Sequence, residues 1–400
     1  MRSKGYGVKK TKMKIYCDKK DIKGDKLIAL DDMILTKDFC TTAGSKMLEG
    51  YKSLFDAQVV STLKEKGYDI LGKTCVGEFN IDLVGETNYV GGETHATAKA
   101  VKSGEVLGAI CLEVNGSVVR QTAQNGLCMI KPTYGVVSRY GTIPVVCSGE
   151  TVSVVANSVE SAKSILDDIS GHDDKDGTSL SSELCSLTKN GAPTEEIKKV
   201  AVLKSLIENL DEKASENFNG VIEKLKNSGV EVTYIEDEII KLSNIAWNAL
   251  MSAELCNNVS RYDGVKYGYR SKTFTNVYDI YKNSRTEAFG EFLKTVILFG
   301  SETLSTENYS KVYDKCLRMR RVIVEEFGKI FANFSAVLMP ACSKMEYSEK
   351  DFENKYLSLE ENKYTAPQMI TGLPVVSVNG VQLVGKAFSE NALCDLAKKI

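Results

Sequence analysis

The sequence predicts an α/β protein whose sheet is covered by helices on both faces, because strand and helix signals alternate along the chain. In one such unit, Asp56 is placed to cap a helix that has a single apolar face. That face holds Val59, Val60 and Leu63. Gly67 is expected to end the helix, and a short strand at 68–71 follows it.

A second unit repeats this order further along the chain. The apolar run 200–203 predicts a strand, and the run 230–235 beyond Gly229 predicts another. Between them lies a helical pattern with the apolar stripe Phe218, Val221, Ile222 and Leu225. Two longer amphipathic helices are expected near 284–299 and 308–332, and Trp247, inside a helical run, is expected in the core.

Length and composition leave the number of domains open. Four hundred residues with 43% hydrophobic content can form one large α/β domain or two or three smaller ones. The sequence has only six prolines and shows no low-complexity linker or internal repeat, so nothing in it marks a domain boundary.

Charge and hydropathy restrict the partners. The formal net charge of −2 leaves no overall electrostatic footprint for nucleic acid, so no direct nucleic-acid partner is predicted. No run of 18 apolar residues occurs and the basic N-terminal stretch has no apolar core, so we expect neither a membrane span nor a secretory signal.

Cysteine and histidine usage points to a cytoplasmic protein without metal. Eleven cysteines are scattered singly with no CxxC pair, which is typical of reduced thiols and not of a disulfide framework or zinc site. His95 and His172 are the only histidines, and we expect no metal and no cofactor.

Several stretches together resemble the amidase signature family, and within it the branch formed by the A subunits of glutamyl-tRNA(Gln) amidotransferases. They run in family order from about residue 27 to the C-terminus, and they are 41–51, 56–74, 130–141, 171–179, 260–270 and 372–378. The resemblance implies one large domain at 26–400 with a central mixed sheet. It also implies that the basic segment 1–25 is truncated relative to the family's N-terminal helical region.

The resemblance implies a chemistry as well. In the family, this subunit hydrolyses glutamine and passes ammonia to a partner subunit, which amidates glutamate esterified to tRNA. The implied machinery is a Ser nucleophile, a second Ser in a cis peptide bond and a Lys. A neutral, desolvated Lys is able to serve as the base for a hydroxyl that is otherwise a poor nucleophile.

Counting back from Lys131 without a gap puts the nucleophile position at Ser117. Gly116 is kept from the family's Asp-Thr-Gly-Gly-Ser turn, whereas Glu113, Val114 and Asn115 replace the rest. Gly116 and Asn115 are therefore candidates for contact with substrate.

The other two catalytic positions have changed residue type. Glu93 occupies the cis-Ser position, 24 residues before Ser117 as in the family, and Asp31 occupies the Lys position. Lys37 lies nearby, but six positions away in register. His95 and an alanine replace residues of the flexible glycine turn.

Substrate recognition is altered too. The family's Lys-Arg-Arg, whose Arg binds the glutamine carboxylate, reads Lys294, Thr295 and Val296 here. The acidic residue that meets the glutamine amino group falls near Asn362, which is the third substrate-binding candidate. Loss of an Arg–carboxylate fork is expected to weaken amino-acid binding.

Replacement bases face physical objections. Glu93 as a base for Ser117 needs a large rise in pKa from burial, and two carboxylates would repel a developing oxyanion. His95 is the better base on pKa alone, although a drifted loop histidine is the simpler interpretation. His172 lies in a polar turn and is expected to be structural or exposed.

Three functional hypotheses follow. The first is a working amidotransferase subunit or amidase that uses Ser117 with a rearranged base. The second is a non-catalytic relative that keeps the fold and the surfaces for amidotransferase partner subunits. The third is new chemistry in the old pocket. Coordinated change at base, relay and recognition positions favours the second. The Tyr- and Arg-rich segment 260–270 is predicted to pack against another subunit.

Overall fold

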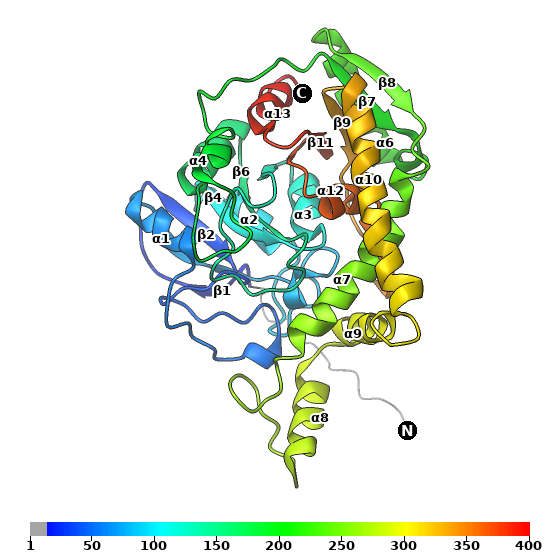
Figure 1. Ribbon diagram of the computed structural model, residues 1–400. Helices are drawn as coiled ribbons and strands as arrows, with labels where there is room; N and C mark the ends of the chain where they lie inside the picture. The colour runs from blue at the N-terminus through cyan, green and yellow to red at the C-terminus, as the bar shows by residue number, and fades with distance from the viewer. Residues whose placement is uncertain (1–13) are drawn as a thin grey trace.

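The computed structural model describes residues 14–400. These residues form a mixed sheet of eleven strands (Figure 1). In spatial order the strands are β1 (Tyr16–Lys19), β3 (Asp69–Thr74), β2 (Leu27–Asp31), β4 (Gly108–Glu113), β6 (Thr151–Ala156), β5 (Cys128–Lys131), β10 (Val375–Val378), β11 (Val381–Gly385), β9 (Ala336–Pro340), β7 (Lys199–Leu203) and β8 (Glu231–Ile235). β2 pairs in parallel with β3 and β4, and β7 pairs in parallel with β8 and β9. The strands between these groups are antiparallel, so the predicted mixed sheet is confirmed.

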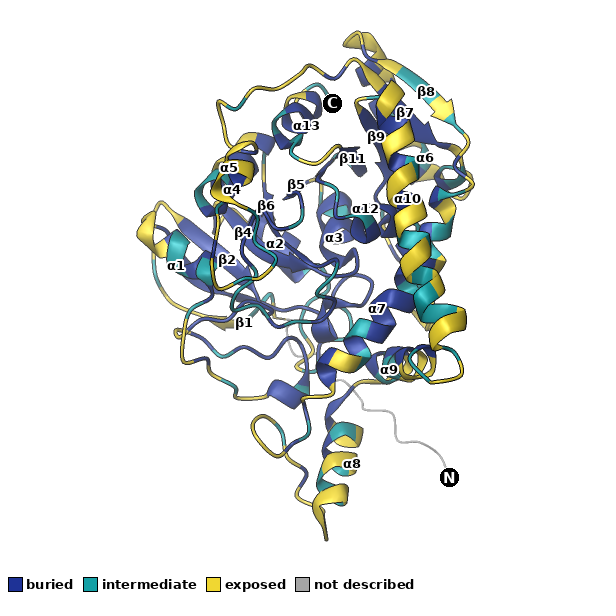
Figure 2. Cartoon of the chain, viewed as in Figure 1, coloured by how far each residue is buried: buried dark blue, intermediate teal, exposed yellow. Residues whose placement is uncertain are grey.

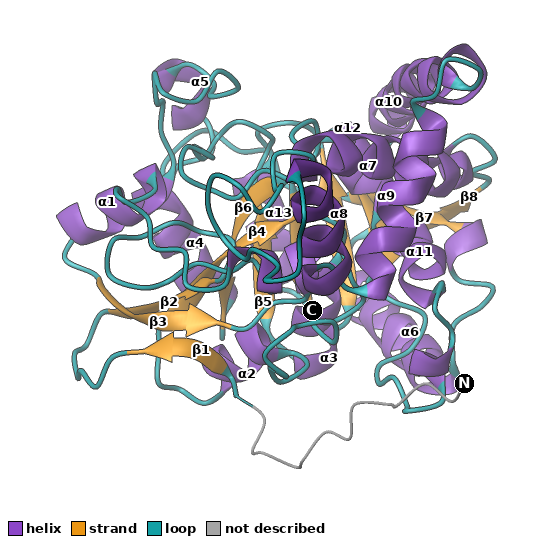
Figure 3. Ribbon diagram, turned by 90° about the horizontal axis from the view of Figure 1, so that it is seen from below, coloured by secondary structure: helices purple, strands orange, loops and turns teal. Residues whose placement is uncertain are grey.

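Helices cover both faces of this sheet (Figures 1 and 3). They are α1 (Gln58–Glu65), α2 (Ala96–Lys102), α3 (Ser117–Asn125), α4 (Val159–Ile169), α5 (Ser182–Ser186), α6 (Glu212–Asn227), α7 (Ser243–Val259), α8 (Val277–Ala288), α9 (Glu291–Thr303), α10 (Asp314–Asn333), α11 (Leu357–Glu361), α12 (Ala366–Thr371) and α13 (Glu390–Ala397). α2 and α3 pack on one face of β4, and α4 packs on the opposite face of β5 and β6. The prediction of a single α/β domain with helices on both faces is confirmed.

The inner strands are buried on both sides, which explains their nearly continuous apolar sequences, whereas the edge strands β1 and β8 are partly exposed. In β2, Leu27 and Ala29 pack into the core layer beneath α2 and α3, whereas Ile28 and Leu30 pack into the opposite layer. Figure 2 shows these strands as buried and the outer surface of α10 as exposed. A polar side chain at the end of such a strand is therefore held in a dry environment.

The first predicted unit is confirmed except for its cap. α1 buries Val59, Val60 and Leu63, and β3 follows the turn at Gly67. The helix is preceded by Ala57, which makes no side-chain cap, so the prediction that Asp56 caps it is wrong. The Asp56 carboxylate instead accepts hydrogen bonds from Thr36 and from the Lys37 amide, because the preceding loop folds back over it.

The second unit is confirmed as predicted. β7 leads into α6, which buries its apolar stripe, and β8 pairs in parallel with β7. The Asp211 carboxylate caps α6 by accepting from the Ala214 amide at 2.7 Å. Trp247 is fully buried in α7, as expected.

The helix predicted at 284–299 is wrong, because the chain breaks it into α8 and α9. Phe289 and Gly290 are extended, and the Gly290 amide donates to the Glu78 carboxylate at 2.9 Å. The Gly290 amide therefore binds Glu78, 212 residues away in the sequence, whereas helical periodicity alone predicted that it lies within a continuous helix. The helix predicted at 308–332 is confirmed as a π-helical turn at Tyr309–Tyr313 followed by α10.

The N-terminal region contributes an edge strand. Residues 1–13 of the basic segment lie outside the described residues, whereas β1 pairs antiparallel with β3. Lys14 forms a bridge with Gly92, next to the candidate site. From residue 14 onward, no helix combines the length and apolar character that a membrane crossing requires.

Candidate functional site

Asp31 ends β2, and its carboxylate is completely buried. One oxygen accepts from the Met33 amide at 3.0 Å, and the other accepts from the Leu112 amide in β4 at 2.7 Å. Burial raises the pKa of Asp31 to about 7, although these amides and Lys73 oppose the rise. Both oxygens are occupied by main-chain donors, so the side chain joins the ends of β2 and β4.

A buried lysine that sequence reasoning missed lies beside it. Lys73 in β3 has no exposed surface, and its Nζ donates to Thr41 Oγ1 at 3.1 Å and to the Ile34 carbonyl. Asp32 Oδ1 lies 3.5 Å from the same nitrogen. These contacts hold the loop that follows β2. Lys37, the other lysine considered, is exposed and uses its amide to bind Asp56.

The turn from β4 to α3 carries the nucleophile position. Glu113 caps α3, because its carboxylate accepts from the Gly116 amide at 2.6 Å and the Val119 amide at 2.9 Å. Gly116 has φ of 86°, and a Cβ there would lie 2.4 Å from Thr365 Oγ1, so glycine is required. Ser117 begins α3, has no exposed surface, and its Oγ accepts from Gln121 Nε2 at 3.2 Å.

The two predicted recognition residues meet around a buried arginine. Arg120 donates to the Asn115 carbonyl at 3.2 Å and to Asn362 Oδ1 at 2.8 Å. The Asn115 side chain is bound on both sides, by Trp247 Nε1 at 2.9 Å and by the Ile81 carbonyl at 2.8 Å. This network brings Asn115 and Asn362 together but leaves their amides engaged within the protein.

Glu93 faces a different partner. Its amide donates to the Lys14 carbonyl at 2.9 Å, and its carboxylate forms an ion pair with Lys99 of α2. His95 adopts a left-handed conformation with φ of 60° at the start of α2. Burial, assisted by the Lys99 charge, lowers the pKa of His95 to about 4, so its ring is neutral at pH 7.

The structure gives each of the predicted catalytic residues its own hydrogen-bond or ion-pair partners. Asp31 and Ser117 flank the end of β4 and are linked through Leu112 and Glu113. Glu93 is held toward Lys99 by its ion pair. All peptide bonds of residues 14–400 are trans. His172 is exposed and binds Asp174 in a polar turn, as expected.

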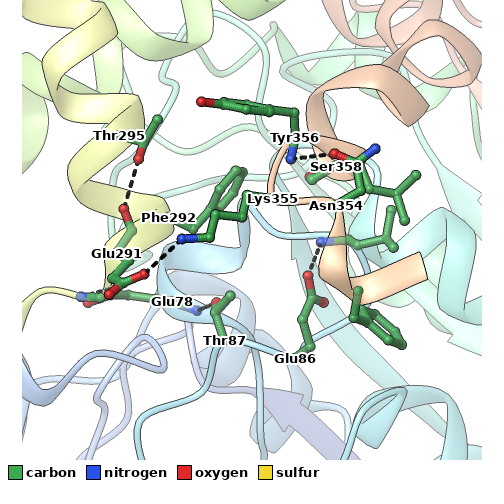
Figure 4. Close-up of a pocket in the computed structure, with 14 residues that line it drawn as sticks. Glu78, Glu86, Thr87, Glu291, Phe292, Thr295, Asn354, Lys355, Tyr356 and Ser358 are labelled. Carbon is green, nitrogen blue, oxygen red and sulfur yellow. Dashed lines mark hydrogen bonds and ion pairs between the residues drawn. The ribbon is translucent and has the colours of Figure 1, made fainter. Parts of the chain in front are cut away.

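A cavity of about 380 Å³ opens at a different place (Figure 4). Its walls come from the loop 78–87, the first turn of α9 and the segment 352–358. Thr295, from the stretch that the sequence aligns with the family's Lys-Arg-Arg, lines it, whereas Ser117, Asp31 and Glu93 do not. None of the three predicted catalytic positions therefore lines this cavity.

Two glutamates give this cavity its electrostatic character. Glu78 accepts from Ser45 Oγ at 2.6 Å and from the Gly290 amide, and burial raises its pKa to about 7. Glu86 accepts from the Leu83 and Val84 amides, and burial raises its pKa to about 8. These residues were missed because no periodicity marks loop carboxylates, and because the donors to Glu78 come from distant segments. Within residues 14–400, no cluster of His, Cys, Asp and Glu suits a metal ion.

The fold is that of a single α/β domain built around one large mixed sheet. The model of the family described as Amidase matches residues 27–394, so the chain belongs to the amidase family.

Particular relatives are components of an amidotransferase. The chain is 33% identical to the glutamyl-tRNA(Gln) amidotransferase A subunit of Latilactobacillus sakei subsp. sakei (strain 23K), over 94% of this chain and 83% of the relative. It is also 33% identical to the same subunit of Campylobacter concisus (strain 13826), over 93% of this chain and 87% of the relative.

Solved structures agree in fold. The crystal structure of the glutamyl-tRNA(Gln) amidotransferase A subunit from Thermotoga maritima matches with a TM-score of 0.75 and 26% identity, over 94% of this chain and 82% of that chain. Kluyveromyces lactis allophanate hydrolase matches with a TM-score of 0.78 and 21% identity, over 94% of this chain and 61% of that chain, which concerns the fold alone.

Proposed function

We propose that this protein is a non-catalytic relative of the glutamyl-tRNA(Gln) amidotransferase A subunit, and that it acts by binding amidotransferase subunits in the cytoplasm. The observation that carries the proposal is the environment of Ser117. Its hydroxyl is fully buried and its hydrogen-bond partner is the Gln121 amide, which cannot accept a proton as a base does.

The position of the family's lysine supports the same conclusion. Asp31 stands there, and both of its oxygens accept from main-chain amides. A carboxylate whose oxygens both accept hydrogen bonds from main-chain amides cannot donate a hydrogen bond to an oxyanion. It also cannot replace a neutral lysine amine as the catalytic base. Glu93 is held by Lys99, so the relay position is occupied by an ion pair.

The alternative is a working amidotransferase subunit or amidase that uses Ser117 with a rearranged base. Lys73 is a fully buried lysine whose Nζ lies 3.5 Å from Asp32, the neighbour of Asp31 in the chain, which is the observation in favour of this alternative. Its contacts with Ile34, Thr41 and Asp32 hold it to the loop after β2.

A glutaminase assay separates the two. We expect ammonia release from glutamine at background for the wild type, and no change in Ser117→Ala or in the surface control Ser228→Ala, with or without partner subunits. Loss of a working nucleophile costs several powers of ten in rate, so residual activity would be visible as a difference. Ammonia release that depends on Ser117 would refute the proposal.

The double reversion Asp31→Lys with Glu93→Ser provides a second arm. We expect it to stay inactive, because Thr295 still leaves the glutamine carboxylate without its Arg. The new lysine would also be fully buried at the position of Asp31. Recovery of glutamine hydrolysis would show that the turn itself is competent.

The unpaired cysteines and the exposed part of the segment 260–270 are consistent with a binding role in translation. All eleven cysteines are unpaired, as in proteins of reducing compartments. Part of the segment 260–270 remains exposed, at Val265 and Tyr267, and is the proposed contact with a partner subunit.

A further inference from the structure

Three carboxylates lie in the loop between β3 and α2, of which Glu78 and Asp82 are buried and Glu86 is half-buried. Glu78, Asp82 and Glu86 all have raised pKa values, and burial is the largest cause for each. The donors to Glu78 and Glu86 are one hydroxyl and three backbone amides, all neutral. Buried carboxylates without a cation are costly, so such groups either hold a proton or meet a cationic partner.

Glu78 and Glu86 open into the cavity of about 380 Å³, which is within the range of small-molecule sites. Phe292, Phe352 and Tyr356 supply aromatic walls around it. An aromatic face attracts an ammonium group and also packs against an alkyl chain. The cavity therefore combines negative carboxylates in its floor with apolar walls.

The protein's own Lys355 already places an alkylammonium at this cavity. Its Nζ lies 3.5 Å from Glu291 across the cavity, as Figure 4 shows. Both side chains of this ion pair are largely exposed, so a ligand displaces it at little cost. The other nearby cation, Lys294, donates to the Thr286 carbonyl and acts on Glu78 only from a distance.

We propose that this cavity is a binding site for a small aliphatic primary amine, whose ammonium group meets Glu78 and Glu86 while its alkyl chain packs on Phe292 and the neighbouring aromatic residues. The ligand is bound and not cleaved, since Ser117 does not line the cavity. This site is independent of whether Ser117 is active.

The charge of the cavity excludes the opposite class of ligand. Glu78, Glu86 and Glu291 outnumber Lys355, and Thr295 contributes no charge. A carboxylate would meet uncompensated negative groups as the pH rises. The selectivity is therefore for a cation over an anion of the same size.

The test is isothermal titration of the full-length protein with n-pentylamine, using n-pentanol and pentanoate as neutral and anionic controls of the same chain length. We expect saturable one-to-one binding of the amine with a Kd on the order of 1 mM or tighter, and much weaker binding of both controls. The amine remains charged across the working range, as lysine does.

Affinity should rise with pH. Glu78 and Glu86 must lose their protons to pair with the ammonium, and their pKa values are raised to about 7 and about 8. Asp82, Glu291, Lys294 and Lys355 are the other charged groups around them. Binding linked to release of one proton should strengthen about tenfold or more from pH 6 to pH 8.

Three variants and one control locate the site. Glu78→Gln and Glu86→Gln should each weaken amine binding about tenfold, whereas Glu223→Gln on the exposed side of α6 should not change it. Thr295→Arg alters an exposed residue, so it remains informative if the buried variants fail to fold. It should abolish amine binding and favour pentanoate.

Three results would each overturn the proposal. The first is binding of n-pentanol as tight as that of n-pentylamine, which would leave only an apolar cavity. The second is an amine affinity that Thr295→Arg leaves unchanged. The third is an absence of saturable binding up to tens of millimolar amine at pH 8.

Discussion

At the scale of the residue, the chemistry of the candidate site is set by burial of carboxylates. Asp31, Glu78, Glu86 and Glu113 are all removed from water, and desolvation is the main reason that the pKa of each is raised. Main-chain amides satisfy their oxygens in place of basic side chains. Because these pKa values differ from those of the unfolded chain, the free energy of unfolding depends on pH, whereas surface glutamates with ordinary pKa values add no such dependence.

Glu86→Gln should remove part of that dependence. The folded protein keeps a proton on Glu86 up to about pH 8, whereas the unfolded chain loses it near the ordinary value of about 4.3. The resulting stability is complete below the unfolded value and is lost as the pH rises through 8. Since glutamine does not ionise, the Tm of the variant relative to wild type should increase from pH 5.5 to pH 8.5.

Thermal unfolding followed by circular dichroism at three pH values measures this difference. Glu223→Gln, an exposed change on α6, is the matched control and should track the wild type throughout. If Glu86→Gln also tracks the wild type at every pH, the proton on Glu86 does not contribute to stability.

At the scale of the element, capping residues mark where helices begin. Two of these capping residues are carboxylates that lie just before the helix they cap. Asp211 caps α6 and Glu113 caps α3. α6 is one of the longer helices and covers the β7–β8 side of the sheet with a well-defined apolar face. Its cap is therefore a local feature with a measurable share in stability.

Asp211→Ala should lower the free energy of unfolding by about 1 kcal/mol, because the Ala214 amide loses its acceptor. Urea denaturation measures the change, and Asp211→Asn should retain most of the stability since asparagine also caps helices. Equal loss in both variants would mean that the charge near the helix dipole, and not the hydrogen bond, carries the effect.

At the scale of the whole molecule, the proposed intersubunit contact concerns the tip of the segment 260–270. The start of this segment belongs to the chain's own core, because Tyr262 is buried against Phe79. The segment is also held together internally, since Arg270 donates to the Gly264 and Val265 carbonyls. The exposed residues Val265 and Lys266 remain for a partner.

Val265→Asp should reduce co-purification with amidotransferase subunits at least tenfold, because it places a charge at an apolar contact of the interface. Affinity capture from cells that express these subunits measures the effect, with Lys224→Glu on α6 as an exposed control. A wild-type protein that purifies strictly alone would contradict a retained interface.

Local patterns were enough to predict most of the helices and strands. The apolar faces of α1 and α6 depend on residues three or four positions apart, so their sequence periodicity is sufficient. The break between α8 and α9 was missed because its cause, Glu78, lies far away in the chain. The cap of α1 was wrong for a similar reason, since a loop folds back to take Asp56.

The sequence by itself determined the family and the mixed α/β sheet, and it predicts that Asp31, Glu93 and Thr295 stand where the family's chemistry needs other residues. Only the tertiary structure decided which groups those side chains meet: amides for Asp31, Lys99 for Glu93, and a cavity with buried glutamates beside Thr295. The reason is physical. Periodicity and motif spacing reflect neighbours along the chain, whereas burial and hydrogen-bond partners such as Arg120 and Asn362, 242 residues apart, exist only once the sheet has closed around them.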